Sequence, residues 1–573
     1  MKGSLLGLGD GMKILLKNGQ VVNVFTGEIE RANVLMEDGI IIGVGDYYSD
    51  ADADVCEDVS GKILCPGFID GHIHIESTML APTELAKAVL PHGTVSVIAD
   101  PHEIANVCGR EGIAYMLEAS KGLPLCVYVS LPSCVPATPF DESGAVLNAK
   151  DLKDFYIYDR VVGLGEMMNF PGVLASDEDV MRKIYDARRL RRSVDGHAPG
   201  LSGKALDAYI SAGIGSDHEC TTAEEAIEKI RKGQTIMIRQ GTAARNLDAL
   251  LPLFDEPYCH RCILVTDDLH PADIMSEGHI DNIIRKAVAK GKSAITGIQM
   301  ATIGAARYFG LGHVGAIAPG YRADILVLDD LDSVDVRDVY SSGVKVVDNK
   351  EVLDFEAPKV NEYLEERVRN SFHLPPLRAM DFRIEEKSNR CRVIGVLGGG
   401  LITEEKIMDI VWGETGGVDT ERDILKVAVI ERYNNTGHIG LGFINGIGLK
   451  RGAIASSVSH DSHNIIVIGT NDTDMAIAAN RIREVGGNVV VCDGKVISEM
   501  SLSIGGLMSD ASAAEVARQN KAVREAVKEL GVCEGVEPFM NMAFVSLPVI
   551  PSLKISTCGL IDVNKQEKVP LCV

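Results

Sequence analysis

The sequence is poor in aromatic residues: they make up 5% of its 573 residues, and only one is Trp. Proteins that hold single-stranded nucleic acid stack its bases on aromatic side chains. Basic residues are also in the minority, because 57 Lys and Arg stand against 81 Asp and Glu and leave a net charge of −24. A surface of this sign repels a phosphate backbone. The composition therefore argues against a nucleic acid polymer as a partner.

Long hydrophobic runs are absent as well. No stretch of about 18 apolar residues is free of charge, so no membrane-spanning helix is expected. The opening residues MKGSLLGLGDG interrupt their apolar stretch with Gly and Asp, which makes a poor secretory signal. Thirteen cysteines without a framework spacing suit a reducing cytosol better than a disulfide scaffold. The sequence thus predicts a cytoplasmic protein without membrane contact.

A long middle segment alternates short apolar strands with helical patterns. Helical patterns such as DEDVMRKIYDARRL and TAEEAIEKIRKG separate the strand candidates. The candidates are FIDGHIHI, TVSVIAD, LCVYVSLPS, VVGLGE, RSVDGH, AGIGSDHE, QTIMIRQG and RCILVTDD. Eight strands alternating with helices over about 250 residues predict an α/β fold, a (β/α)₈ barrel at residues 63–310.

Small β segments flank this middle at residues 1–62 and 311–356. In the first, Asn-Gly, Asp-Gly and Ser-Gly pairs between apolar stretches predict hairpins. Residues 357–385 read as a charged connection. A C-terminal α+β domain is expected at residues 386–573, with its strands first and its helices after them.

Histidines and carboxylates occupy the ends of six of the eight predicted strands. In a barrel, the carboxyl ends of the strands face one site. His72 and His74 share a face because alternate residues of a strand project the same way, and two such imidazoles can bind one metal ion. A single buried His is more often a hydrogen-bonded core residue. The residues at the strand ends are His72 and His74, Asp100, Glu166, His197, His218 with Glu219, and Asp267.

This set exceeds what one tetrahedral ion needs, since three protein ligands and a water suffice for a catalytic zinc. The surplus predicts two divalent metal ions that share a bridging carboxylate and a bridging hydroxide. Glu166 lies between the two imidazole pairs in strand order and is the expected bridge. The hydroxide is a nucleophile at neutral pH, and Asp267 could bind metal and accept its proton. Mixed nitrogen and oxygen ligands suit Zn, Mn or Fe(II).

The order of these residues resembles the amidohydrolase superfamily: HxH after the first strand, His on the fifth and sixth, Asp on the eighth. GKILCPGFIDGHIH and GAIAPGYRADILVLD resemble the entry to and exit from that superfamily's small β-sandwich, which implies a composite sandwich of the two flanking segments. Within the superfamily, the sequence more closely resembles the bacterial and archaeal adenine deaminases. This resemblance rests on PGFIDGHIHIESTM, VIADPHEIANVCG, GEMMNFPGV, DGHAPG and SDHE, and on SSVSHDSHNIIVIGTN in the C-terminal domain particular to that family.

The resemblance implies a hydrolase that converts adenine and water to hypoxanthine and ammonia, with a metal-bridging hydroxide attacking C6. It implies two divalent ions, Mn or Fe(II) before Zn, and a homodimer. An acid must protonate the ring as charge moves onto it, and Asp100 and Glu219 are the candidates. Asp100 could instead cap the helix that begins near Pro101, and Glu219 could orient His218.

Three further histidines are candidates for substrate binding. His270 follows TDDL and could line the mouth of the barrel. His460 and His463, in HDSHN, could reach into the site or bind a metal, or could belong to an ordinary polar turn. His102 and the remaining histidines have no spacing that indicates a role.

Other functions remain as alternatives. Cyclic-amide hydrolysis or deacetylation could use the same metals, although Glu166, where a carboxylated Lys would stand, argues against the hydantoinase and dihydroorotase branches. A non-catalytic scaffold would be expected to have lost ligands. A zinc cytidine-deaminase site would pair HIE with PYCHRC, but Tyr258 interrupts the second motif and the two lie about 180 residues apart. We expect CHRC to be core and loop.

Overall fold

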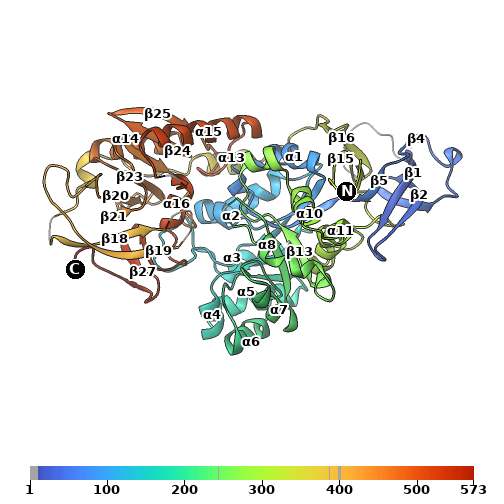
Figure 1. Cartoon of the computed structure of the whole chain (residues 1–573), viewed down its shortest axis with the longest axis horizontal. Helices are drawn as coiled ribbons and strands as arrows, with labels where there is room; N and C mark the ends of the chain where they lie inside the picture. Colours follow the sequence, from blue (N-terminus) through green and yellow to red (C-terminus); the bar gives the residue numbers. More distant parts are fainter. Residues whose placement is uncertain (1–10, 243, 386–387, 398–401, 534) are drawn as a thin grey trace.

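The computed structural model describes residues 11–242, 244–385, 388–397, 402–533 and 535–573. Three regions follow one another along the long axis of the molecule (Figure 1). The N-terminal strands lie at one end, the helices and strands of the middle segment at the centre, and the C-terminal sheet at the other end. Within the described ranges, no helix has the length and apolar character needed to cross a membrane.

The two flanking β segments pair in one sheet of nine described strands. Their order is β17-β16-β15-β14-β5-β1-β2-β3, with β4 parallel to β1. Since β5 pairs with β14, residues 63–66 belong to this sheet and not to the middle segment. The bounds are β1 (Lys13–Asn23), β2 (Glu28–Glu37), β3 (Ile40–Gly45), β4 (Val55–Asp58), β5 (Ile63–Pro66), β14 (Ile325–Leu328), β15 (Val336–Ser341), β16 (Val344–Asp348) and β17 (Glu351–Val352).

Two of the predicted hairpins are wrong. Ser60 and Gly61 lie between β4 and β5, which both run parallel to β1 and do not form a hairpin with each other. Asp38 and Gly39 do turn the chain between β2 and β3, but Asn18 and Gly19 lie inside β1, which continues through a bulge. Asn18 has φ 62°, and its backbone N–H, displaced from the ladder, donates to Asn33 Oδ1 at 2.8 Å. A β-bulge uses the same left-handed conformation as a tight turn, so the Asn-Gly pair fits both.

All eight strands predicted for the middle segment are confirmed. β6 to β10 form a parallel sheet and β11 to β13 a second one. A parallel bridge between Ile73 and Asp267 brings the end of the last strand to the end of the first. The strands are β6 (Phe68–Ile73), β7 (Thr94–Ala99), β8 (Cys126–Leu131), β9 (Val161–Met167), β10 (Ser193–Gly196), β11 (Ser216–Asp217), β12 (Thr235–Arg239) and β13 (Cys262–Val265). We call residues 68–310 the α/β region.

Amphipathic helices connect these strands. In α5, Val180, Ile184 and Ala187 are buried at spacings of four and three, and Asp177 caps the first turn. α2 begins at His102, as expected for a helix that starts near Pro101, so DPHE lies at a helix start. The helices are α1 (Pro82–Val89), α2 (His102–Ala119), α3 (Ala149–Leu152), α4 (Phe170–Ala175), α5 (Glu178–Arg189), α6 (Gly203–Ala212), α7 (Ala223–Arg231), α8 (Leu247–Leu250), α9 (Pro271–Glu277), α10 (Ile280–Ala289), α11 (Ala294–Gln299) and α12 (Ala305–Phe309).

The C-terminal region contains a sheet of eight described strands in the order β19-β18-β21-β20-β23-β22-β24-β25. Two of them, the buried β24 and its partner β25, lie between helices, so the predicted order of strands first and helices after is wrong in this part. The strands are β18 (Arg390–Val396), β19 (Thr403–Asp409), β20 (Leu425–Ile430), β21 (Ile439–Asn445), β22 (Ala453–Ser456), β23 (Ile465–Gly469), β24 (Asn488–Cys492), β25 (Lys495–Met500), β26 (Leu553–Ser556), β27 (Gly559–Asp562) and β28 (Glu567–Lys568). The helices are α13 (Glu362–Arg369), α14 (Asp472–Val485), α15 (Ala513–Glu529) and α16 (Pro538–Val545).

The C-terminal region contacts the α/β region near the carboxyl end of β6. Ala81 donates its backbone N–H to the Ser509 carbonyl at 2.9 Å, and Ser509 donates to the Met79 carbonyl at 2.9 Å. The loop between β22 and β23 carries the HDSHN residues toward this contact. Both regions therefore contribute side chains near the strand ends.

Candidate metal centre

The structure brings the six predicted metal-binding side chains together at the carboxyl ends of the parallel strands. Five of them are buried, and His197 has 19% of its side chain exposed. They lie in or just after three strands of the first sheet and two of the second: His72 and His74 at β6, Glu166 in β9, His197 after β10, His218 after β11 and Asp267 after β13.

Glu166 lies between two groups of imidazoles. Its Oε1 is 3.3 Å from His74 Nε2. Its Oε2 is 2.7 Å from His197 Nδ1 and 3.1 Å from His218 Nε2. Burial alone would raise the pKa of Glu166, but the charges and hydrogen bonds of these imidazoles hold it well below its usual value. The carboxylate is therefore ionised, and each of its oxygens faces a different group.

Asp267 closes the cluster on the side of the HxH pair. Its Oδ1 lies 3.1 Å from His74 Nε2 and 3.5 Å from His72 Nε2. Its backbone N–H donates to the His72 carbonyl at 2.9 Å, while its carbonyl accepts from His74 N–H at 3.3 Å. Burial would raise the pKa of Asp267, but Arg239 and the two imidazoles hold it well below its usual value.

These side chains form a donor set that fits divalent metal ions. His72, His74 and Asp267 offer ligand atoms within 4.8 Å of one another, and so do His72, Glu166 and His218. Within the described residues, the buried His72 Nε2 has no hydrogen-bond partner. Burial lowers the pKa of His72, which favours its neutral form. Burial would also lower the pKa of His74, His197 and His218, but Glu166 and the neighbouring carboxylates raise it, so a metal ion would displace protons from these imidazoles. Neutral imidazoles and ionised carboxylates are the forms that bind metal.

Comparison with known proteins places the chain in a family. Residues 63–352 match the amidohydrolase family, and residues 400–567 match the adenine deaminase C-terminal domain. The chain is 47% identical to adenine deaminase 2 of Carboxydothermus hydrogenoformans, over 97% of this chain and 96% of that protein. It is 46% identical to the adenine deaminase of Kosmotoga olearia, over 98% of this chain and 96% of that protein. The chain belongs to the adenine deaminase family.

Among solved structures, β-aspartyl dipeptidase from Fervidobacterium islandicum AW-1 aligns with a TM-score of 0.48 and 18% identity, covering 61% of this chain and 100% of that one.

Asp100 supports two members of the cluster. Its Oδ2 accepts the Glu166 backbone N–H at 2.9 Å, and its carbonyl oxygen lies 3.0 Å from His74 Nδ1. A proton on His74 Nδ1 leaves the Nε2 lone pair facing Glu166 and Asp267. The alternative role as a helix cap is wrong, because the Asp100 carboxylate accepts its hydrogen bond from β9 and the Ile104 N–H in the first turn of α2 donates to Glu76 Oε1 at 3.1 Å.

Glu219 lies at the rim of the cluster. Its Oε1 is 3.3 Å from His218 Nε2 and accepts a hydrogen bond from Arg239 Nη1, which also donates to Asp267 Oδ2 at 2.6 Å. Burial would raise the pKa of Glu219, but His197 and Arg239 lower it strongly. Arg239 thus joins two carboxylates of the site, a role that the sequence did not indicate.

Two residues of the DPHE motif, His102 and Glu103, also lie at the site, although the sequence analysis assigned them no role. His102 Nδ1 lies 3.5 Å from Glu166 Oε1. Glu103 Oε1 lies 3.0 Å from His460 Nδ1, and its Oε2 lies 3.9 Å from His463 Nε2. Their position directly after β7, next to Asp100, was the signal in the sequence that could have identified them.

A cavity of about 280 Å³ lies between the α/β region and the C-terminal region. His270 and His460, two of the predicted substrate-binding residues, line it. His463 does not line it: this side chain is buried, and its Nδ1 accepts the Ser459 N–H at 3.2 Å. Burial lowers the pKa of His270.

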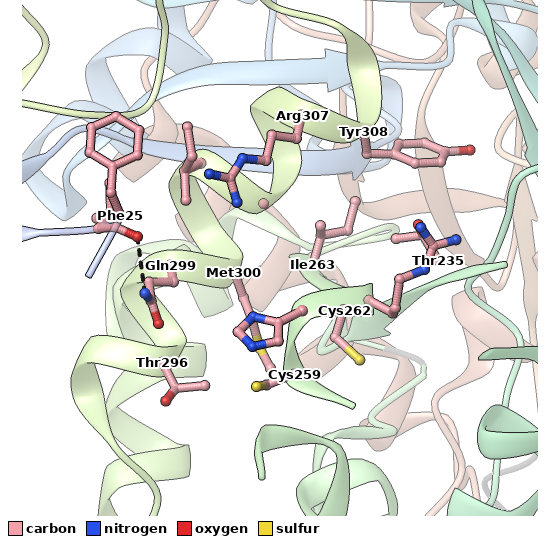
Figure 2. A pocket seen from close by; sticks show the side chains of 15 residues that line it. Phe25, Thr235, Cys259, Cys262, Ile263, Thr296, Gln299, Met300, Arg307 and Tyr308 are labelled. Atoms are coloured by element: carbon pink, nitrogen blue, oxygen red, sulfur yellow. Dashed lines mark hydrogen bonds between the residues drawn. The ribbon is translucent and has the colours of Figure 1, made fainter. Parts of the chain in front are cut away.

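A second cavity of about 280 Å³ lies at the amino ends of β12 and β13 (Figure 2). Phe25 and Gln299 lie on one side of it and Tyr308 on another, and Gln299 Nε2 donates to the Val24 carbonyl at 3.0 Å. Its described lining holds no Asp or Glu. Cys259 and Cys262 belong to this end of the α/β region, whereas HIE lies at the carboxyl end of β6. The cytidine-deaminase interpretation is therefore wrong, because the two motifs lie at opposite ends of the strands.

Asp217 fixes the loops that carry His197 and His218. Its Oδ2 accepts the Ala198 N–H at 3.0 Å, and its Oδ1 accepts the Glu219 N–H at 2.7 Å. Lys229 Nζ, fully buried, lies 3.3 Å from the same carboxylate. The ion pair holds both loops in place.

We expect Lys229→Met to destabilise the α/β region by about 3–5 kcal/mol, because it leaves the buried Asp217 carboxylate without its cation. Calorimetry of thermal unfolding measures the change. Lys232→Met is the matched control: Lys232 forms a partly exposed pair with Asp207, and its loss should cost about 1 kcal/mol or less. Equal shifts in the two variants would contradict the role given to Lys229.

Proposed function

We propose that this protein is an adenine deaminase, a hydrolase that converts adenine and water to hypoxanthine and ammonia. The observation that carries the proposal is the convergence of all six predicted ligands at one end of the strands, with Glu166 facing imidazoles through both of its oxygens. Full-length relatives at 47% and 46% identity bear the name adenine deaminase. We also interpret the two parallel sheets as one closed (β/α)₈ barrel, since Ile73 and Asp267 join their ends.

His72, His74 and Asp267 would hold one divalent ion, His197 and His218 a second, and Glu166 would contact both. When bound, the ions supply Lewis acidity and lower the pKa of water, which makes water a nucleophile near neutral pH. We favour Mn or Fe(II), with Zn as an alternative, because the ligands mix nitrogen and oxygen.

The protein's own side chains move the protons of the reaction. Water oxygen bonds to C6 of adenine, and the bond between C6 and the exocyclic nitrogen breaks. Asp267, the carboxylate shared with the HxH pair, accepts a proton from the water and returns it to the departing amine, which leaves as ammonia. The second water proton leaves the C6 oxygen as it becomes the carbonyl of hypoxanthine, and it replaces the proton that the acid gave to the ring nitrogen. Glu219 is held ionised by Arg239 and so orients His218. Asp100, whose Oδ1 has no hydrogen-bond partner among the described residues, remains the candidate that protonates the ring.

The test is an assay of the Mn-loaded protein with adenine. We expect the absorbance of adenine to change to that of hypoxanthine, with one ammonia released per adenine consumed. Protein carrying Asp267→Asn, prepared in the same way, controls for a contaminating deaminase. Turnover of a cyclic amide or an acetylated amine, with none of adenine, would contradict the assignment and favour another amidohydrolase reaction.

A further inference from the structure

We propose that His460, held by Glu103, is a substrate-positioning residue that the C-terminal region contributes to the cavity above the metal centre. The ligand of this cavity would be a purine base, whose ring nitrogen accepts a hydrogen bond from His460. This inference rests on the proposed function and adds the part of the site that holds the purine.

The cavity adjoins the metal centre through its lining. Ser77 and Asp268 line it, and Asp268 directly follows Asp267 in the chain. Ser77 Oγ donates to Asp268 Oδ1 at 2.6 Å and lies 3.3 Å from Glu103 Oε1. From the other side, His460 and Phe544 line the same cavity, with their rings stacked at 4.6 Å between centroids. A ligand here would contact both regions of the protein.

Glu103 orients His460. The carboxylate is 1% exposed, and a buried charge of this kind is costly unless it is paired. Its partner is His460 Nδ1 at 3.0 Å, on a different region of the chain. With Nδ1 directed at Glu103, Nε2 is the ring nitrogen left for a ligand. Burial would lower the pKa of His460, but the Glu103 charge raises it to about 9, so Nε2 carries a proton to donate.

A metal ion held by Glu103, His460 and His463 is the competing explanation, since their ligand atoms lie within 4.8 Å of one another. The hydrogen bond from Ser459 N–H to His463 Nδ1 argues against it. A neutral imidazole that accepts at Nδ1 carries its proton on Nε2, and this nitrogen faces Glu103. His463 Nε2 is thus an N–H without a lone pair for a metal, and at 3.9 Å from Glu103 Oε2 it makes no hydrogen bond to that carboxylate.

The experiment compares His460→Ala and Glu103→Gln with the wild type, all loaded with Mn. We measure kcat and KM for adenine, the Kd of hypoxanthine by calorimetry, and metal content. We expect His460→Ala to raise KM and Kd at least about tenfold, because a hydrogen bond from a charged group is lost. Glu103→Gln should give a smaller rise, and metal content should stay at the wild-type level in both. His460→Leu, which fills part of the same space and has no donor, should give the same rise and serves if the Ala variant fails to fold.

His260→Ala is the matched control, because His260 forms an exposed pair with Glu256 and lines the cavity at the opposite end of the strands. It should change neither KM nor Kd. Binding of purine analogues in which carbon replaces N3 or N7 tests the hydrogen bond itself, because a purely structural role of His460 would not distinguish the two analogues. The wild type should bind the analogue that lacks the hydrogen-bonded nitrogen about tenfold more weakly than the other analogue. His460→Ala should bind the two analogues equally.

Unchanged KM and Kd in His460→Ala would overturn the inference. Loss of about one metal ion per chain would also overturn it, in favour of a metal site. A wild-type protein that does not deaminate adenine contradicts the proposed function, whereas an active wild type with unaltered His460 variants contradicts the inference alone.

Discussion

Asp267→Asn is expected to lower kcat for adenine by about 10²–10⁴-fold with KM changed only a few-fold, the range for loss of a general base. The asparagine amide keeps a carbonyl oxygen near His72 and His74 but cannot accept the proton of the attacking water. Metal analysis of the same samples separates this loss from loss of an ion. Steady-state kinetics with the Mn-loaded variant measure the effect.

Asp255→Asn is the control for this substitution, because Asp255 is an exposed partner of Lys292 on the same region. It should leave kcat at the wild-type value. An Asp267→Asn variant that keeps its metal and turns over adenine at a near wild-type rate would remove Asp267 from the mechanism.

Glu166→Gln should reduce the bound metal from two ions per chain toward one. It should also lower kcat at least about 10²-fold, since bound metal ions lower the activation barrier by several kcal/mol. The amide has nearly the shape of the carboxylate but lacks its charge, and its nitrogen cannot serve as a ligand. One of the two imidazole groups then loses its shared anion. Elemental analysis of the Mn-loaded variant gives the number of ions.

Glu219→Gln is the matched control within the same cluster. Glu219 touches His218 and Arg239 but does not lie between the two imidazole groups. We expect it to retain both ions and to lose less activity. Two ions retained at full occupancy in Glu166→Gln would refute the bridging role.

The sequence was informative where chemistry and local pattern coincide. Six of the eight strands of the α/β region end at His, Asp or Glu, so periodicity located the strands and the residues at their ends located the cluster. His72 and His74 could be paired because a strand fixes the directions of alternate side chains. Six polar residues distant in sequence could then be assigned to one site.

The remaining features depend on contacts that are distant in the sequence. Arg239 ends β12 in an otherwise apolar strand, and only the position of Asp267 and Glu219 explains its presence. Glu103 follows β7 and Asp100, which could place it near the site, but its partner His460 comes from the C-terminal region and no local pattern indicates that contact. The bulge at Asn18 depends on the Asn33 side chain of the neighbouring strand. In each case, a contact between residues distant in the sequence determines the role.

The central claim is that Glu166 joins two metal sites that act together on adenine. The adenine assay, run while Mn²⁺ is added stepwise to metal-free protein, tests it most directly. The account predicts that the rate of hypoxanthine formation rises until two equivalents per chain are bound and then stays constant. A rate that reaches its maximum at one equivalent, or no turnover of adenine at any loading, would contradict it.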